Sequence, residues 1–334
     1  MTKRLSRSEL RPLAFWLVGF FALWGCALWR SEQWGDVAQH WVLALLVGVR
    51  SLLGAFAPIG SGAAGLPWLL ATGDNSLDAA RTWGLSVQIV GMTSAITLIL
   101  CRRLTVDWPM VRSGVWGCLF GTPLGLRYFA PLVPRTWAIV LYCAVWCAFG
   151  LTLLQWGRVI AERPDQRVPP GTKLTKFAFL AGWLGGGCFG SVLGGGAAIP
   201  FYVVMVLLRR TSLRTAMTSC AMLMGFNAFL SLAFLSVVGG LEPAALGRWL
   251  ATAPVVCVGV PLGFLVLQRC PPRFFLLLAA VSCLAAAAWM LVRFQSDLGG
   301  GGLLAVGLGV LYLTKACWTL NLLGDVKAEI RRQS

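Results

Sequence analysis

The chain has 334 residues, of which 58% are hydrophobic and only 12% are charged, and its mean hydropathy is +0.77. These values exclude a soluble globular domain and predict several membrane spans. The 28 Lys and Arg residues outnumber the 12 acidic ones, but they lie between apolar runs rather than in one patch. We therefore expect them to contact the lipid bilayer and not nucleic acid.

The N-terminus carries a basic tail before an apolar run at about 12–29, a pattern that resembles a signal peptide. The bulky Trp24 beside the candidate cleavage point, and the many apolar runs that follow, argue against removal of this segment. We predict that segment 1–36 is a cytoplasmic tail with one extra span. Segment 296–334 is predicted to be a second extra span with a C-terminal tail.

Two apolar stretches, 58–67 and 185–200, are interrupted by glycine and proline. An interior glycine costs a helix about 0.8–1.0 kcal/mol relative to alanine and a proline about 3 kcal/mol, so a plain membrane anchor would not carry them. The apolar runs that follow, at about 64–73 and 197–208, are too short to cross about 30 Å of hydrocarbon. Each break is therefore predicted to join the arms of a re-entrant hairpin, where non-helical backbone lines a cavity.

The two breaks belong to an internal repeat. Glycine, serine and proline keep their order and approximate spacing in four pairs of segments: 62–67 with 195–200, 76–80 with 212–216, 123–125 with 261–263, and 134–135 with 272–273. We predict repeat 1 over 37–157 and repeat 2 over 174–295, each with one hairpin and three full spans, joined by a cytoplasmic linker at 158–173. The predicted fold is an all-α polytopic membrane protein with two inverted repeats and one extra span at each end.

The basic residues set the predicted orientation. If each hairpin enters and leaves on the same face, most of the Lys and Arg outside the spans fall on the side of the two termini. The positive-inside bias then makes this side cytoplasmic and predicts a multi-pass protein of the cell inner membrane. Three full spans in each half would invert one half relative to the other, so that the hairpin tips meet near the midplane, where such transporters bind substrate.

A helix that restarts after the second break would present unpaired amides and a partial positive charge to an anion. The predicted substrate-binding residues lie in the two breaks and on nearby helices: Gly60, Ser61, Gly62, Gly65, Pro67, Arg50, Gly194, Gly195, Gly196, Pro200, Thr218, Ser219, Asn227 and Thr82. Other interpretations stay open for each group. The glycines could serve close helix packing, Arg50 could extend to the membrane surface, and the hydroxyls could bond within or between helices.

The sequence predicts neither a metal nor a cofactor. Its 11 cysteines show no CxxC or zinc spacing, and the single His40 is interpreted as a residue of the membrane interface. A hydrolase would need a nucleophile with a base, and only Ser61 and His40 offer such a pair, without a third group. We therefore do not expect an enzyme.

The stretch 189–200, Phe-Gly-Ser-Val-Leu-Gly-Gly-Gly-Ala-Ala-Ile-Pro, resembles the glycine-rich motif of the TauE/SafE family of sulfite-exporter-like permeases. Thr218-Ser219, Asn227 and the segments 107–108, 121–125 and 259–263 fit the same pattern, so the resemblance covers about 45–295. The first half departs from it, with Trp83 in place of a serine and Gly91 in place of an asparagine.

This resemblance implies a secondary permease that moves a small anion, such as sulfite, an organosulfonate or a related oxyanion. The alternative on the same fold is a non-transporting membrane scaffold or sensor, since a fold does not fix a function. The sequence leaves open which anion is moved, the direction of transport, the coupling ion and the oligomeric state.

Overall fold

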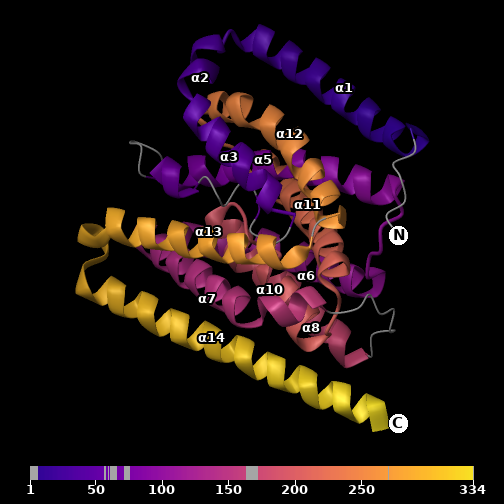
Figure 1. Ribbon diagram of the computed structural model, residues 1–334. Coiled ribbons are helices and arrows are strands. Elements are labelled where there is room, and N and C mark those ends of the chain that lie inside the picture. Colours follow the sequence, from indigo (N-terminus) through magenta and orange to yellow (C-terminus); the bar gives the residue numbers. More distant parts are fainter. Residues whose placement is uncertain are drawn as a thin grey trace.

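The computed structural model describes residues 7–55, 58, 60, 66–70, 76–162, 172–269 and 271–333, and the regular elements within them are all helices. Eight helices in this part of the chain are long and apolar enough to cross a membrane. The predicted all-α polytopic membrane protein is thereby confirmed. Helices α1 (Arg7–Ser31) and α14 (Gln295–Gln333) lie on opposite flanks of the bundle, and the start of α1 and the end of α14 lie at its right side in Figure 1.

The elements of the two halves follow one another in the same order. The first half contains α2 (Trp34–Gln39), α3 (Trp41–Leu53), a short helix at 66–70, α5 (Leu77–Cys101), α6 (Trp108–Leu124), the π-helical η1 (Gly125–Phe129), η2 (Ala130–Leu132) and α7 (Arg135–Glu162). The second half contains α8 (Thr172–Leu184), the π-helical η3 (Gly185–Gly190), α9 (Ser191–Leu193), α10 (Ile199–Val203), the π-helical η4 (Val204–Leu208), α11 (Leu213–Val237), α12 (Ala245–Arg269) and α13 (Pro272–Arg293).

The aligned segments at 76–80 and 212–216 form matching helix starts. Ser76 caps α5 and Ser212 caps α11, each with an extended backbone and a side chain that accepts a hydrogen bond from the amide three residues later. Such a cap stabilises a helix by about 1 kcal/mol. Both helices are 25 residues long and buried along much of their length, so they form the centre of the bundle.

Helices α5 and α11 run in opposite directions. Near the start of α5, the Thr82 hydroxyl accepts a hydrogen bond of 3.4 Å from the amide of Glu242, which follows the end of α11. Near the start of α11, the Ser219 hydroxyl accepts one of 3.0 Å from the amide of Asp107, which follows the end of α5. Each helix therefore begins where the other ends.

The two helices cross at positions that the sequence repeat makes equivalent. The Gln88 side chain of α5 donates a hydrogen bond of 3.3 Å to the carbonyl oxygen of Met224 in α11. With Ser76 aligned on Ser212, these two residues are counterparts. An inverted repeat requires such a crossing, and the repeat itself stays a prediction that these contacts support.

The second hairpin begins and ends beside the start of α6. Ser113 of α6 donates a hydrogen bond of 2.6 Å to the carbonyl of Thr175 in the first turn of α8. Arg209, just after η4, forms an ion pair with Asp107 at the start of α6. The two arms of the hairpin, which lead to and from the glycine break, therefore have their outer ends at the same face of the bundle.

The first hairpin lies at the opposite face. Asp36 of α2 lies against Gly247 at the start of α12, so that a methyl group added to Gly247 would be 2.7 Å from its carboxylate. At the other end of the hairpin, Arg135 at the start of α7 donates a hydrogen bond of 2.7 Å to the carbonyl of Leu70. Helix α7 begins after α6 has crossed the bundle, and α12 begins after α11 has crossed it from the same side. The starts of α7 and α12 therefore lie at the face opposite to the start of α6.

Glycines let each hairpin pack on a span of the other half. On α6, a methyl group added to Gly121 would lie 2.9 Å from the Cα atom of Trp183 in α8. On α12, a methyl group added to Gly259 would collide with Ser51 of α3. The repeated segments 121–125 and 259–263 therefore serve close helix packing, in which small residues allow two backbones to approach.

The structure corrects the predicted extent of the second break. Residues 185–193 of the stretch 185–200 remain helical, and only 194–198 leave the helix. The glycines of η3 instead let the helix approach its neighbours, since a methyl group on Gly187 would lie 3.0 Å from the carbonyl oxygen of Gly121. Close packing, rather than a loss of helix, is the physical reason for this part of the glycine run.

Two predicted spans also differ in extent. The segment Leu174–Leu193, predicted as a hairpin arm, is long and apolar enough to cross a membrane. The segment 111–129, predicted as a full span, is divided between α6, which has 17 residues, and η1. Helix α7 continues to Glu162, past the predicted boundary at 157, and α14 contains a non-helical residue at Gly299.

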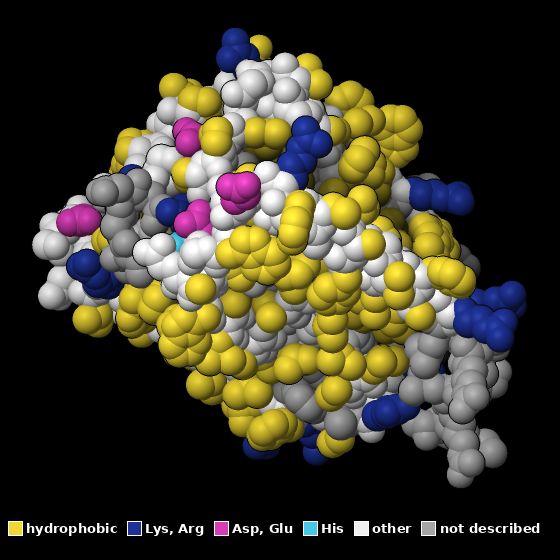
Figure 2. Space-filling model, turned by 90° about the horizontal axis from the view of Figure 1, so that it is seen from above, with side chains coloured by type: hydrophobic (Ala, Val, Ile, Leu, Met, Phe, Trp, Pro, Cys, Tyr) yellow, Lys and Arg dark blue, Asp and Glu magenta, His cyan; other side chains and the backbone are white. Residues whose placement is uncertain are grey.

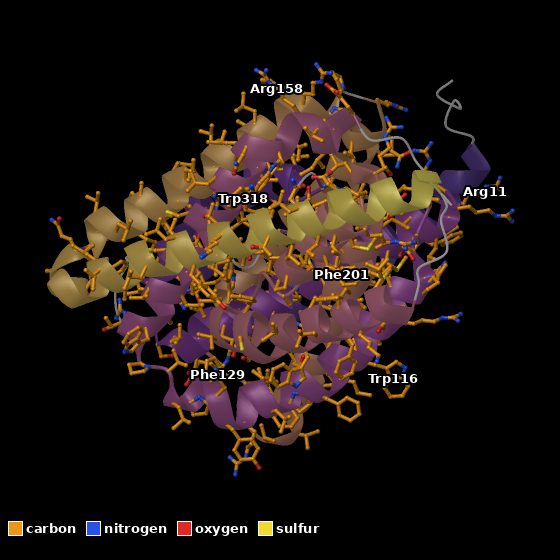
Figure 3. The ribbon with its side chains drawn as sticks, turned by 90° about the horizontal axis from the view of Figure 1, so that it is seen from below. Arg11, Trp116, Phe129, Arg158, Phe201 and Trp318 are labelled. Atoms are coloured by element: carbon orange, nitrogen blue, oxygen red, sulfur yellow. The ribbon has the colours of Figure 1, made fainter. Side chains whose placement is uncertain are left out.

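The outer surface of the bundle suits a hydrocarbon environment. Hydrophobic side chains cover much of the face seen from above, with Lys and Arg side chains mainly towards its edges (Figure 2). From below, α14 crosses the bundle and carries the half-exposed Trp318, whereas Phe201 of α10 belongs to the buried core (Figure 3). We expect the apolar side chains on this surface to face lipid.

Candidate functional site

The break in the second hairpin forms a buried tip whose backbone donors lack acceptors among the described residues. Gly194 and Gly196 have φ values of 63° and 76°, a left-handed backbone that glycine adopts at little cost. Within the described part of the chain, the amides of residues 195–198 donate to no acceptor. A ten-residue helical segment, Ile199–Leu208, begins directly after them. Consecutive free amides at the start of a helix attract negative charge.

The tip of the first hairpin lies beside this second tip. Gly60 also has a positive φ, 71°. A methyl group added to Gly60 would lie 3.7 Å from the amide nitrogen of Gly196 and 2.8 Å from Oε1 of Gln88. Gln88 is completely buried at the middle of α5. The two breaks therefore adjoin each other in the centre of the bundle, with the Gln88 amide next to them.

Aromatic side chains of α7 form one wall of this region. Trp146 stacks on Tyr142 with ring centroids 4.3 Å apart, and both are almost completely buried. A methyl group added to Gly196 would lie 3.0 Å from the Trp146 ring. The benzene edge of the indole faces Gly196, and the indole nitrogen has no acceptor among the described residues.

Arg50 is partly buried and binds to α13. Its Nη2 donates hydrogen bonds of 2.8 Å to both the hydroxyl and the carbonyl oxygen of Ser282, in the middle of that helix. Its guanidinium also interacts electrostatically with Tyr142. The Tyr142–Trp146 pair therefore lies between the positive charge of Arg50 and Gly196. The hydrogen bonds to Ser282 hold this charge beside the middle of α13 and not at the membrane surface.

Arg81 brings a second cation to the second tip. Its backbone lies against Gly194, and Nη1 donates a hydrogen bond of 3.3 Å to the carbonyl of Ser191, just before the break. The side chain is 6% exposed and pairs with the largely exposed Asp78 at 2.8 Å. Solvent around the exposed Asp78 carboxylate weakens its attraction for Arg81. The buried guanidinium therefore keeps part of its attraction for an anion at the tip.

Asn227 of α11 lies under the second tip. Its Oδ1 accepts a hydrogen bond of 2.7 Å from Thr122 of α6, and its Nδ2 has no acceptor among the described residues. A methyl group added to Gly190 would lie 2.7 Å from this Nδ2 and 3.3 Å from the Cβ atom of Ala197. The structure thus brings a predicted binding residue, with a free buried donor, next to the break.

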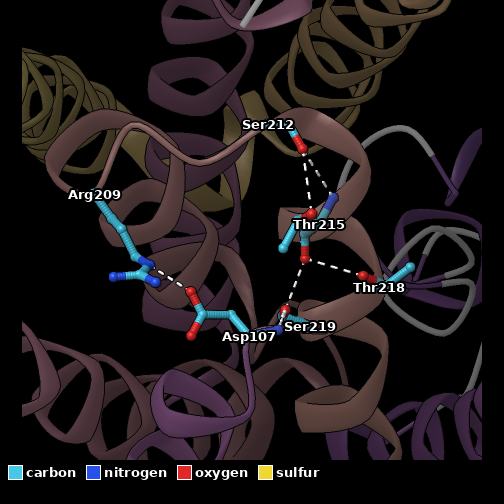
Figure 4. A network of polar contacts seen from close by, with 6 residues as sticks. All are labelled: Asp107, Arg209, Ser212, Thr215, Thr218 and Ser219. Atoms are coloured by element: carbon cyan, nitrogen blue, oxygen red, sulfur yellow. Dashed lines mark hydrogen bonds and ion pairs between the residues drawn. The ribbon is translucent and has the colours of Figure 1, made fainter. Parts of the chain in front are cut away.

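The other predicted hydroxyl residues contact loops at the ends of helices. Thr218 donates a hydrogen bond to the carbonyl of Thr105, and Ser219 accepts one from the amide of Asp107. Figure 4 shows them in a network that also contains Arg209. The Thr82 hydroxyl bonds to the amide of Glu242 in the same way, at the opposite face, as described above. Each of the three hydroxyls therefore ties the start of a central helix to the loop beside it.

The remaining predicted residues are placed as follows. Pro67 is buried in the short helix at 66–70, and Pro200 occupies the first turn of α10, where a missing amide hydrogen costs little. Gly195 is buried in the tip between the two left-handed glycines. Ser61, Gly62 and Gly65 lie outside the described residues, so their assignment stays a prediction.

Sequence reasoning missed the Tyr142–Trp146 pair and Arg81. The aromatic pair lies within a long apolar run, where nothing distinguishes a residue that faces the core from one that faces lipid. The sequence feature that could have indicated this pair is the spacing of two polar aromatic residues one helical turn apart, which places them on the same face of a helix. Arg81 lies in the first turns of its span and therefore counted as a surface cation.

The family model for the sulfite exporter TauE/SafE matches residues 84–290. The chain belongs to this family. The match includes the second tip, Gln88, Trp146 and Asn227, whereas Gly60 and Arg50 precede it. The chain matches no curated protein and no solved structure.

Membership of the TauE/SafE family makes the protein a membrane permease in a family of exporters of sulfur-containing anions. The donors around the two tips are of the kind that binds an oxyanion, because each is a buried N–H group that would otherwise lack an acceptor. Among the described residues, no group of three His, Cys, Asp or Glu side chains could hold a metal ion. The arrangement is thus one of hydrogen-bond donors and two flanking guanidinium groups.

Proposed function

We propose that this TauE/SafE protein moves a small sulfur oxyanion, such as sulfite or an organosulfonate, across the inner membrane. The anion lies between the two hairpin tips, where the amides of residues 195–198 and the Asn227 side chain donate hydrogen bonds to it. Arg50 and Arg81 supply positive charge at a distance. The two halves rock about this point to expose it alternately to each face.

The observation that carries the proposal is the contact between the tips. Gly60 and Gly196 come from hairpins that begin at opposite faces, and they adjoin each other beside the buried Gln88. A ligand at this point would lie beside the middle of α5, between the faces at which the two hairpins begin, where alternating access can expose it to either side. The same arrangement supports two inverted repeats, with both chain ends on the cytoplasmic side, where most of the basic residues lie.

Gly195 gives the sharpest test of the proposed site. Its two neighbours have positive φ values and it does not, so a side chain there fills the tip without straining the backbone. We expect Gly195→Leu to abolish flux in proteoliposomes loaded with sulfite, thiosulfate, sulfoacetate or taurine. Gly307→Leu on the exposed face of α14, with nothing within 4 Å of an added methyl group, is the matched control and should transport normally.

Expression and thermal stability of both variants are measured in the same detergent. Normal flux by a well-folded Gly195→Leu variant would show that the anion does not pass between the tips. If the unmodified protein carries none of the four anions, the alternative of a non-transporting scaffold or sensor gains support.

A further inference from the structure

Gln88 is a buried acceptor without a donor. Its side chain is 0% exposed, and Oε1 receives no hydrogen bond from the described residues. Oε1 lies beside the first tip, 2.8 Å from a methyl group added to Gly60, and the Gly196 amide nitrogen of the second tip lies 3.7 Å from the same methyl group. Native proteins rarely leave a buried carbonyl oxygen unsatisfied, because it has lost its bonds to water.

The contact with α11 fixes which way the Gln88 amide faces. Its Nε2 donates to the carbonyl oxygen of Met224 at 3.3 Å, and that oxygen can only accept a hydrogen bond. A flipped amide would place two acceptors against each other. The NH₂ group must therefore face Met224, and the oxygen must face the tips.

The region between the tips thus offers two kinds of partner. The amides of residues 195–198 and Asn227 Nδ2 are donors, and they match the oxygens of an anion. Gln88 Oε1 is an acceptor that no anionic oxygen can satisfy, because such an oxygen would repel it. Within an anionic substrate, only a group with its own O–H or N–H can donate a hydrogen bond to Gln88 Oε1.

We propose that Gln88 selects anions that carry a hydrogen-bond donor. This inference rests on the proposed function and narrows its substrate class. The favoured substrates are hydrogen sulfite and sulfonates with a hydroxyl or amino group, and anions of the same charge without a donor are disfavoured. An analogue that leaves a buried polar group of the site unpaired is rejected strongly. An analogue that is merely smaller than the substrate is rejected less strongly.

Three sulfonates of equal charge separate the donor from size and polarity. Isethionate carries a terminal hydroxyl, propane-1-sulfonate replaces it by a methyl group, and 2-methoxyethanesulfonate keeps the oxygen but has no donor. Initial flux of each is measured in proteoliposomes of the full chain, and the leak of protein-free liposomes is subtracted. We expect isethionate to move at least about tenfold faster than the other two, as the loss of one buried hydrogen bond predicts.

The variant Gln88→Met tests the residue itself, because methionine is what the second half has at the equivalent position, 224. It should carry the three sulfonates at similar rates. Gln155→Met, which changes an exposed glutamine of α7, is the matched control and should keep the preference for isethionate.

Each outcome decides a different point. Equal flux of the three sulfonates through the unmodified protein overturns the inference, because water would then satisfy Gln88. A preference for isethionate that survives in Gln88→Met overturns it as well. If Gln88→Met does not fold, the comparison of the three sulfonates in the unmodified protein still decides. Absence of flux for these anions and for sulfite would refute the proposed function, and this inference with it.

Discussion

The ion pair between Asp107 and Arg209 joins the end of the second hairpin to the start of α6. The two side chains are only 5% and 8% exposed, respectively. The amide of Asp107 also donates to Ser219, so the carboxylate is positioned by two elements. We therefore expect that replacing either charged residue alone will destabilise the protein strongly.

Burial decides the size of this effect. Removal of one partner leaves a buried charge without compensation, which costs about 3–5 kcal/mol, whereas an exposed pair contributes about 0–1 kcal/mol. The pair between Arg273 and Glu162 is 60% and 57% exposed and serves as the internal comparison. We predict that Arg209→Met lowers the free energy of unfolding by several kcal/mol and that Arg273→Met changes it by less than about 1 kcal/mol.

The assay is reversible unfolding of the purified protein in mixed micelles with increasing SDS, followed by tryptophan fluorescence. The double variant Asp107→Asn with Arg209→Met completes a thermodynamic cycle and should recover part of the loss, because no buried charge remains unpaired. The reasoning is refuted if Arg209→Met costs no more than Arg273→Met, since burial would then not govern the strength of the pair.

Two further predictions concern the packing of α6 and the protonation of the only histidine. Gly121→Ala places a methyl group against the backbone of Trp183, so it should destabilise the protein by more than about 1 kcal/mol in the same assay, whereas Gly307→Ala on α14 should be neutral or slightly stabilising. Equal stability of the two variants would contradict the close approach of the helices.

Burial, aided by Arg248 and opposed by Asp36, lowers the pKa of His40. The unfolded chain therefore binds a proton at His40 more readily than the folded chain, and stability should fall as the pH drops through about 6.5. Thermal melts between about pH 7 and pH 5 should show a smaller fall for His40→Gln, and identical slopes would contradict the prediction.

The sequence is sufficient to predict features that glycine, proline and serine impose locally. The pairing of 76–80 with 212–216 and the restart of a helix after the second break are predicted in this way. The structure shows a helix start at each of these places, because the backbone preferences of serine and proline do not depend on distant contacts. The lengths of the apolar runs likewise predict eight long helices. One of the eight differs, because the structure has Leu174–Leu193 in place of the predicted span 111–129. These features needed no knowledge of which helices touch.

The parts that could not be predicted depend on contacts between distant residues. A run of glycines favours both a break and close packing, and only the approach of α6 explains why Gly187 stays helical while Gly194 does not. The direction of a hydroxyl is equally ambiguous in a sequence. Thr218 and Asn227 lie on one helix, yet the first contacts a loop and the second lies under the tip.

The exchange of hairpins between the halves has a consequence for synthesis of the protein. The first hairpin packs on α12, which the ribosome produces last but two among the long helices, so α3 must wait in the membrane for a partner more than 150 residues downstream. A fragment that stops before Ala245 would leave that surface uncovered and open to degradation. The packing of neither half is therefore complete until the other half has been synthesised.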